Sequence, residues 1–423
     1  MAGLACHAGY ADSQGMILAR LLGAQAASLL RPPFLPYWLG QSVSALGDRV
    51  TTVALPAVVL SLGGGATELA RLASWSTGAA LLLLLAGGVL VDRLSPRTVM
   101  LVTDGLRAVL LAVVAWQLAR GGASITLLVY VSALLGACSA VFSPATVSIL
   151  PQLVEDDQLV SANALRNLTG SLSGVIGPAV GGTLVALGGA GFALGVDALS
   201  FAAGFLGLFL MRPRKAAKRT TPGTPLWKEA SEGFRIILAS TWLWLTIAVF
   251  SVMNIFGAGL YVVLLPLYAR QVLGGVQALG WLYAAQAVGA VLAALLLGRM
   301  GRVRRRGVVA YLAVVVQGGA ILLLGVSHVL PLAMLALFLT GASITVFGVV
   351  WQATLQERVP KEALGRVASV DLLGGIALIP VGLLLVGRGV TIVGMTPGIL
   401  ICGGVAVVLA ALALTTRAVR ELD

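Results

Sequence analysis

The sequence predicts an all-α integral membrane protein with twelve transmembrane helices, arranged as two pseudo-symmetric six-helix halves. Of its 423 residues, 59% are hydrophobic and only 10% are charged, whereas about a quarter of the residues of a soluble domain are charged. Apolar runs of about 20 residues recur along the chain, which is the length needed to cross a hydrocarbon layer of roughly 30 Å. These two observations favour a chain that crosses the lipid bilayer many times.

Glycine, proline and charged residues divide the apolar runs into twelve expected spans. Six fall within an N-terminal half, 32–211, and six within a C-terminal half, 241–415. The expected spans are 34–62, 67–91, 98–119, 124–149, 163–188, 190–211, 241–269, 277–298, 307–327, 330–355, 366–388 and 391–415.

The segments outside the two halves are polar. Residues 212–240 read as a basic, proline-containing cytoplasmic linker followed by an amphipathic helix at the membrane surface. Residues 1–31 carry no Lys or Arg before Arg20, so they lack the basic region of a signal peptide. We expect either a disordered tail or a sequence read from too early a start, with Met16 as the true initiator. Residues 416–423 form a short cytoplasmic tail.

The net charge of +12 does not indicate nucleic-acid binding, because the basic residues lie in short loops between apolar runs. Most of them fall on the side shared by both termini, the linker and every second loop. The positive-inside rule then places both termini in the cytoplasm of a plasma or inner membrane. We expect a monomer whose partners are lipid, protons and a small-molecule substrate.

The two halves resemble each other at corresponding positions. The segment 151–165 precedes span five and 355–369 precedes span eleven, each with a charged amphipathic turn. Likewise 88–97 follows span two and 298–307 follows span eight. An internal repeat of roughly 205 to 210 residues is typical of secondary transporters, which bind substrate between their repeats.

These features resemble the major facilitator superfamily over residues 32–415. The stretches that carry the resemblance are "GVLVDRLSPR" at 88–97, "FLPYWLGQSVSALGDRVTTVALP" at 34–56, "NALRNLTGSLSGVIGPAVGG" at 163–182 and "VDALSFAAGFL" at 196–206. The last three are similar to the drug- and siderophore-exporting branch of the superfamily. The resemblance implies the major facilitator fold and export of a small molecule.

Two opposite charges lie inside the first span. Asp48 lies ten residues, or about 15 Å along a helix, from Trp38, which we expect at the cytoplasmic interface, so Asp48 and Arg49 lie near the bilayer midplane. Neighbours on a helix point about 100° apart, so each needs its own partner on another helix. Candidates are Asp104 and Arg107 on span three and Asp197 on span six. One hypothesis is that Asp48 takes up and releases a proton during transport; the alternative is a permanent structural ion pair.

A charged loop follows span two and contains Gly88, Asp92, Arg93 and Arg97. Charge-assisted hydrogen bonds from such a loop to neighbouring helix ends are physically favourable. The resemblance implies a latch that holds the two halves together in one conformation and releases them in the other. The alternative is a loop that only orients the chain.

Small residues break up span five at Gly177, Pro178, Gly181 and Gly182. Proline kinks the helix and glycine lets another backbone approach closely. The motif therefore indicates either a pliable seam near the cavity or ordinary packing of small residues.

Three neutral polar residues lie at membrane depth in the C-terminal half: Asn254, Gln286 and Gln317. Their amides suit hydrogen bonds to a substrate, and they are also the residues that hold transmembrane helices together. We treat them as candidates for the substrate cavity.

The sequence favours a secondary active transporter over other classes. None of its lysines completes a phosphate-binding loop, which argues against an ATP-driven pump, and its two histidines, His7 and His328, support neither a catalytic nor a metal centre. We expect no enzyme activity, cofactor or metal. The leading hypothesis is proton-coupled efflux of an amphipathic small molecule by alternating access. The alternatives are an importer or facilitator of the same fold and, less favoured, a non-transporting scaffold.

Overall fold

The computed structural model describes residues 33–93, 95–211, 234–300 and 303–422. The expected N-terminal tail and most of the 212–240 linker lie outside these ranges. Within them, the side chains of 85–93, 361–362, 366 and 369 are not described.

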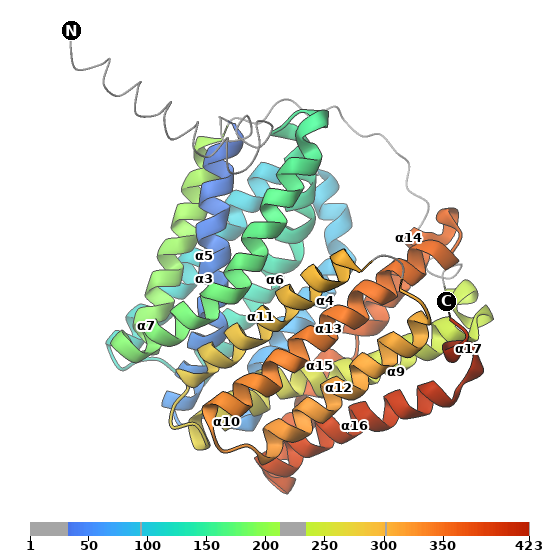
Figure 1. Ribbon diagram of the computed structural model, residues 1–423. Coiled ribbons are helices and arrows are strands. Elements are labelled where there is room, and N and C mark those ends of the chain that lie inside the picture. Colours follow the sequence, from blue (N-terminus) through green and yellow to red (C-terminus); the bar gives the residue numbers. More distant parts are fainter. Residues whose placement is uncertain (1–32, 94, 212–233, 301–302, 423) are drawn as a thin grey trace.

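Five long helices form what we call the N-terminal bundle (Figure 1). Serine residues form the N-caps of two of them. The hydroxyl of Ser95 accepts a hydrogen bond from the Thr98 amide at 3.1 Å, and that of Ser124 accepts one from the Leu127 amide at 3.2 Å. Such caps satisfy amides that the first turn of a helix leaves free. The helices are α3 (Phe34–Ser61), α4 (Ala66–Arg93), α5 (Pro96–Ala119), α6 (Ile125–Ile149) and α7 (Leu159–Leu210).

Helix α7 is two antiparallel limbs joined at Gly189. This residue has φ 78° and ψ 171°, a conformation that is essentially restricted to glycine. Gly394, 205 positions further along, joins α15 to α16 with φ 91° and ψ 170°. The same rare backbone conformation thus recurs at the spacing that the sequence repeat predicts, between the last two helices of each bundle.

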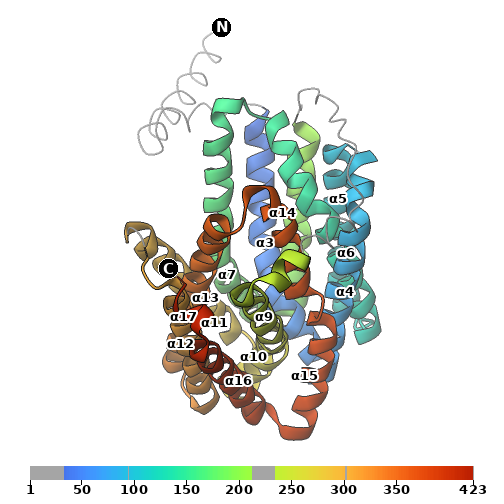
Figure 2. The ribbon, with the colours of Figure 1, turned by 90° about the vertical axis from the view of Figure 1, so that its right-hand side faces the viewer.

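The remaining helices form the C-terminal bundle (Figures 1 and 2). Residues 234–239 are helical and bury Ile237 against α13 and α14. The helices that follow are α9 (Thr241–Gly259), a π-helical turn (Leu260–Leu264), α10 (Leu265–Gln271), α11 (Ala278–Arg299), α12 (Arg306–Val326), α13 (Leu330–Arg358), α14 (Lys361–Ile376), α15 (Ile379–Val393), α16 (Met395–Thr415) and α17 (Arg417–Arg420).

The outside of both bundles is apolar. Leu82, Leu187, Leu199 and Ile392 are each more than 70% exposed, which is unfavourable in water and favourable in lipid. Among the described residues, ten helices are long and apolar enough to cross a membrane, and α7 counts once among them although it turns back at Gly189. The chain is therefore a multi-pass membrane protein of helical fold, while the number twelve stays a prediction.

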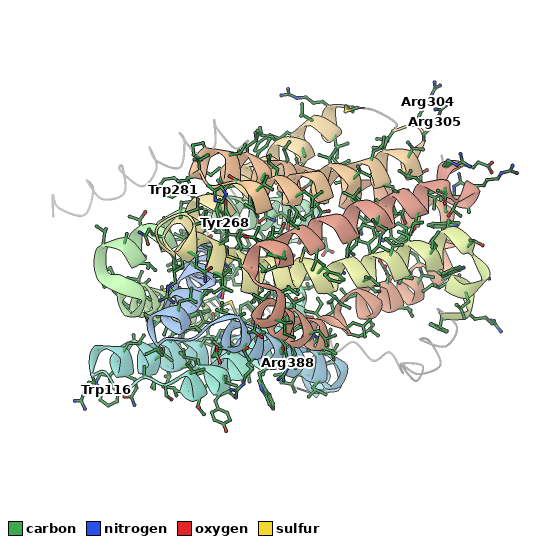
Figure 3. All side chains as sticks on the ribbon, turned by 90° about the horizontal axis from the view of Figure 1, so that it is seen from below. Trp116, Tyr268, Trp281, Arg304, Arg305 and Arg388 are labelled. Carbon is green, nitrogen blue, oxygen red and sulfur yellow. The ribbon has the colours of Figure 1, made fainter. Side chains whose placement is uncertain are left out.

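The two ends of the molecule differ in chemistry. We call the end at which α3 begins and α16 finishes the tail end. Arg304 and Arg305 project there, whereas Trp116 and Trp281 lie toward the opposite end (Figure 3). The two tryptophans are about half exposed, as expected for aromatic anchors at a membrane surface.

The two bundles touch most closely toward the end opposite the tail end. There Arg270 donates a hydrogen bond to the Leu60 carbonyl oxygen at 2.8 Å, and Ser74 donates one to the Pro380 carbonyl oxygen at 2.8 Å. Toward the tail end the axes of the bundles diverge (Figure 1). The boundaries at 211 and 241 agree with this division but stay predictions.

Replacing Gly189 with alanine is expected to destabilise the fold by about 1–3 kcal/mol, because a side chain disfavours this backbone conformation. Gly174→Ala is the matched control, since it lies in α7 with open space around its Cα. The measurement is the unfolding temperature of the purified chain in detergent. Equal temperatures for both variants would show that the turn at Gly189 is not conformationally strained for other residues.

Candidate functional site

A seam of small residues brings α3 against the second limb of α7. A Cβ atom added at Gly40 would lie 2.9 Å from the Ala203 carbonyl oxygen, and one at Gly47 would lie 2.1 Å from an Asp197 carboxyl oxygen. Only glycine permits approaches this close. The seam therefore sets the distance at which polar groups of α7 meet those of α3.

Asp104 of α5 is fully buried and has two partners. Gln41 of α3 donates a hydrogen bond to its Oδ2 atom at 3.0 Å. Its Oδ1 atom lies 3.9 Å from Arg107, one turn further along the same helix. The predicted shared face of Asp104 and Arg107 is thus observed, and the ion pair is completed by an amide from α3.

Arg107 is 4% exposed and is held on four sides. Besides Asp104, its guanidinium donates to the hydroxyl of Ser139 on α6 at 2.9 Å. It also lies 4.9 Å from the centre of the Phe142 ring and 5.3 Å from that of Phe201. Cation–π contacts in a desolvated site contribute up to about 2 kcal/mol each, so Arg107 is fixed between α5, α6 and α7.

Asp197 of α7 is also fully buried. Its carboxyl accepts hydrogen bonds from Thr51 of α3 and, at 2.8 Å, from Ser200 one turn further along α7. Each of its two carboxyl oxygens thus accepts a hydrogen bond from a hydroxyl group, which offsets part of the cost of burying the group. This acid is therefore anchored in place.

Asp48 differs from these two acids because no described residue hydrogen-bonds to it or forms an ion pair with it within 4 Å. Its side chain is exposed, and the surface that it exposes lines a cavity of about 340 Å³ inside the N-terminal bundle. Thr51, Arg107 and Asp197 line the same cavity, and Val262 of the π-helical turn is the residue that the C-terminal bundle adds to it. We call this the inner cavity.

The other wall of the inner cavity is mainly apolar. It includes a hydroxyl, that of Ser132 on α6, which is buried and has no hydrogen-bond partner in the described structure. The apolar lining residues are Leu55, Pro56, Val59, Leu69, Leu72, Ala73, Leu111, Leu135 and Phe201.

Arg49 forms no ion pair with Asp48 within 4 Å in the described structure, although the two residues are adjacent in α3. Its aliphatic stem packs over Gly177 of the first α7 limb, where an added Cβ would lie 2.4 Å from the Arg49 Cβ. The structure thus places Asp48 near Arg107 and Asp197 at the inner cavity, with Asp104 and Arg49 also close enough to act on its charge.

The span-five motif faces two neighbours at once. Gly181 approaches the Val50 backbone of α3, while Gly182 and the Pro178 carbonyl oxygen meet Gly280 of α11 in the other bundle. A Cβ at Gly280 would lie 2.3 Å from that oxygen. The motif is therefore part of the contact between the bundles, and its flexibility stays a prediction.

The predicted gating loop is only partly described. Gly88, Asp92 and Arg93 lie at the end of α4, where the side chains are outside the described set. Arg97 donates hydrogen bonds to the carbonyl oxygens of Leu208 at 3.1 Å and Phe209 at 2.7 Å. It thus ties α5 to the end of α7 within one bundle, and a latch between bundles stays a prediction.

The three amides of the C-terminal bundle do not converge on the inner cavity in this structure. Asn254 donates to the Gly375 carbonyl oxygen at 3.1 Å, next to the break between α14 and α15. The Gln286 backbone packs against Gly341 of α13, and Gln317 borders a small void of about 10 Å³. Their role in binding substrate stays a prediction.

Several residues of the site were not singled out from the sequence. Gln41, Ser132, Phe142 and Phe201 are uncharged and became recognisable only once the helices were packed. Asp371 of α14, which accepts a hydrogen bond from the Trp351 indole at 3.1 Å, is an isolated acid in an apolar span and could have been noticed. In the described part of the chain, no three His, Cys, Asp or Glu residues are placed to hold a metal ion.

A larger hollow lies outside this site. It has a volume of about 860 Å³ and runs between α7, α11 and α13, with Val180, Trp281 and Phe338 among its lining residues. No charged residue lines it. We place the functional site at the inner cavity because polar and charged groups converge there.

Two helical bundles of membrane-spanning length, one of which contains a cavity lined by charged groups, are the architecture of a membrane transporter. The chain belongs to the Major Facilitator Superfamily, whose profile it matches over residues 37–370 and again over 251–422. The second match covers the C-terminal bundle, in keeping with the internal repeat.

Similar proteins of established name include exporters. The chain is 28% identical over 397 residues to the multidrug efflux pump Tap of Mycobacterium tuberculosis (strain ATCC 25618 / H37Rv), covering 90% of this chain and 92% of Tap. It is 28% identical over 346 residues to the enterobactin exporter EntS of Escherichia coli O81 (strain ED1a), covering 80% and 81%. Among solved structures, the nucleoside transporter NupG aligns with a TM-score of 0.71 at 14% identity, covering 90% of this chain and 98% of NupG, and so shares its fold.

Gly47→Ala is expected to destabilise the N-terminal bundle by about 1–3 kcal/mol. The added methyl would meet the Ser200 hydroxyl and the Asp197 carboxyl at 1.9 and 2.1 Å, closer than contacting atoms can lie. The measurement is the unfolding temperature in detergent, with Gly78→Ala in α4, which has open space around it, as the control. If Gly47→Ala unfolds at the same temperature as the control, α3 and α7 are not packed as described.

Proposed function

We propose that this chain is a secondary active exporter that moves an amphipathic small molecule out of the cell in exchange for protons. Membership of the superfamily and the names of two relatives, a multidrug efflux pump and an enterobactin exporter, support export. The coupling to protons is argued from the site.

The observation that carries the proposal is the difference between Asp48, which is exposed to the inner cavity, and the two buried acids Asp104 and Asp197. Asp104 and Asp197 are each held by side-chain partners, whereas Asp48 has none and faces the inner cavity. An acid in a low-dielectric site is costly to ionise without a partner, so binding a proton or a cation there is favourable. Asp48 is therefore the acid best placed to exchange a proton for a guest.

The inner cavity also suits the proposed substrate class. Its volume of about 340 Å³ is within the range of small-molecule sites, about 300–1,000 Å³. Leucine side chains offer apolar contact, and Ser132 and Asp48 offer an acceptor on either side. Such a lining favours a neutral or cationic amphipathic molecule over an anion.

The arrangement of the bundles supports alternating access. Contacts between them lie toward the end opposite the tail end, and their axes diverge toward the tail end. We propose that the tail end faces the cytoplasm, since basic residues gather there. The structure then corresponds to the state that loads substrate from the cell interior, and rocking of the bundles would release it outside.

The direct test is transport of ethidium and of a macrolide by the full chain in vesicles under an imposed pH gradient. Asp48→Asn is expected to fold normally. Its gradient-driven transport rate is expected to fall at least tenfold, because an amide cannot carry the proton. Asp197→Asn is the comparison, since its amide oxygen can still accept a hydrogen bond from one of the two hydroxyl donors, Thr51 or Ser200. Its gradient-driven rate is expected to fall less.

Each other result has a definite meaning. Gradient-driven transport by folded Asp48→Asn at the native rate would refute proton exchange at Asp48. Flux only into the proposed cytoplasmic side would make the chain an importer. No flux of either probe by a folded chain would favour a non-transporting role.

Gly280→Leu is expected to open the contact between the bundles. The new side chain would collide with the Pro178 carbonyl oxygen and the Gly182 backbone, so α7 and α11 must separate at the end opposite the tail end. Spin labels at Ser61 and Gln271, the exposed ends of α3 and α10, should move apart by several ångströms. Gly257→Leu in α9, which has open space, should leave this distance unchanged, and an unchanged distance in Gly280→Leu would contradict the proposed closed contact.

A further inference from the structure

A second cavity lies beside the inner one, nearer the tail end. It has a volume of about 190 Å³ and extends from Phe34 in the first turn of α3 to Asp48. We call it the tail-side cavity. Its lining residues are Phe34, Tyr37, Trp38, Gln41, Ser42, Ser44, Ala45, Asp48, Phe142, Thr146, Arg166, Thr169 and Gly170, all from α3, α6 and the first limb of α7.

Asp48 is the residue that these two described cavities share. Along α3 the tail-side cavity ends at Asp48 and the inner cavity begins there, continuing to Val59. One carboxyl group therefore borders both spaces. A proton on this carboxyl can be reached from either side without movement of α3.

The partition between the cavities is built around Arg107. Phe142 lines the tail-side cavity and Phe201 lines the inner cavity, and the Arg107 guanidinium contacts both rings. On the tail side, Gln41 is bonded to Asp104, which pairs with Arg107. These groups hold one another, so the side chains between the two cavities are fixed by contacts within the N-terminal bundle.

The tail-side cavity can hold water, unlike a space lined only by apolar groups. The hydroxyls of Ser42 and Thr146 donate to carbonyl oxygens of their own helices, at 2.6 and 2.9 Å, and keep acceptor lone pairs. Gln41 and Arg166 add further polar groups. A single water needs about 10–15 Å³ and two or more polar partners, so this cavity has room for several.

We infer that Asp48 exchanges protons with the tail side through the tail-side cavity, separately from the route that the substrate takes. This inference rests on the proposed function, in which Asp48 carries the proton. All residues lining the tail-side cavity belong to the N-terminal bundle, whereas the inner cavity is closed in part by Val262 of the C-terminal bundle. Proton exchange with the tail side then needs no movement between the bundles, whereas release of the substrate at the opposite end does.

The charged groups around Asp48 are not used for the test, because changing any of them would alter its charge environment directly. These groups are Arg49 on the same helix, Asp104 and Arg107 on α5, Asp197 on the second α7 limb and Arg166 on the first. The residues of α6 that line the inner cavity or the tail-side cavity are all uncharged. Gly170 is a neutral alternative. It lines the tail-side cavity, and nothing lies within 4 Å of a Cβ built there.

The experiment blocks the tail-side cavity in the folded protein. Gly170→Cys in the full chain is purified, placed in vesicles and treated with a bulky thiol reagent or with one that adds only a methylthio group. The native chain, treated identically, reports on its own cysteines. Two rates are measured with ethidium: transport driven by a pH gradient, and exchange of labelled for unlabelled ethidium without a gradient, which needs no net proton movement.

The bulky reagent is expected to lower gradient-driven transport at least tenfold and to leave exchange within twofold, and the small reagent is expected to change neither. Loss of both rates would overturn the inference, because the cavity would then belong to the substrate route. No change in either rate, with labelling confirmed by mass spectrometry, would overturn it as well. Thr146→Phe, which fills the same cavity, should reproduce the bulky reagent, whereas Ser143→Phe on an exposed position of α6 that lines neither cavity should not.

These outcomes are separate from failure of the proposed function. If Asp48→Asn transports ethidium at the native gradient-driven rate, the proton is carried elsewhere and the proposed function fails at its first step. If Asp48→Asn loses coupling while blocked Gly170→Cys keeps it, only the separate proton route fails.

Discussion

The guanidinium group of Arg107 is the interaction on which the polar interior of the N-terminal bundle depends. Three carboxyl groups surround it, and the other arginine nearby, Arg49, packs toward a different helix. A low-dielectric interior with more acids than bases carries uncompensated negative charge unless a proton or a cation joins it. Asp104 and Asp197 obtain neutral hydrogen-bond donors, although the Oδ1 atom of Asp104 has only the more distant Arg107, whereas Asp48 has no donor within the described structure. The excess of acidic over basic groups is therefore least compensated at Asp48, the acid that lines the inner cavity.

That balance requires α3 and α7 to lie unusually close. The carboxyl groups reach their donors because glycines at 40, 47 and 204 let the helices touch through their backbones. Larger residues would push the helices apart by the width of a side chain, and hydrogen bonds of about 3 Å do not survive such a displacement. The hydrogen bonds of the buried acids in this bundle therefore depend on the close packing of its helices.

Sequence reasoning could predict the fold because membrane spans are long and because polar residues among them are few. It also placed Asp104 and Arg107 on one face, since their spacing of three depends on one helix alone. It could not predict that Asp48 lacks a partner or that Gln41 and Ser200 serve the other two acids, because those facts depend on the register between helices that are far apart in sequence. For the same reason, Asn254 could be read as a substrate ligand although it bonds to the backbone of α14.

The two bundles share a glycine turn, at Gly189 and Gly394, yet the charge cluster is found in the first bundle. The corresponding interior of the C-terminal bundle is filled by apolar and aromatic residues such as Phe250 and Phe347, whose rings stack 3.7 Å apart. Among the described residues, the two copies of this architecture thus differ in chemistry: the first holds the cluster of ionisable groups, and the second contributes Val262 to the wall of the inner cavity. The donors to Asp104 and Asp197 all belong to the first bundle, so a displacement of the second bundle would leave these hydrogen bonds intact.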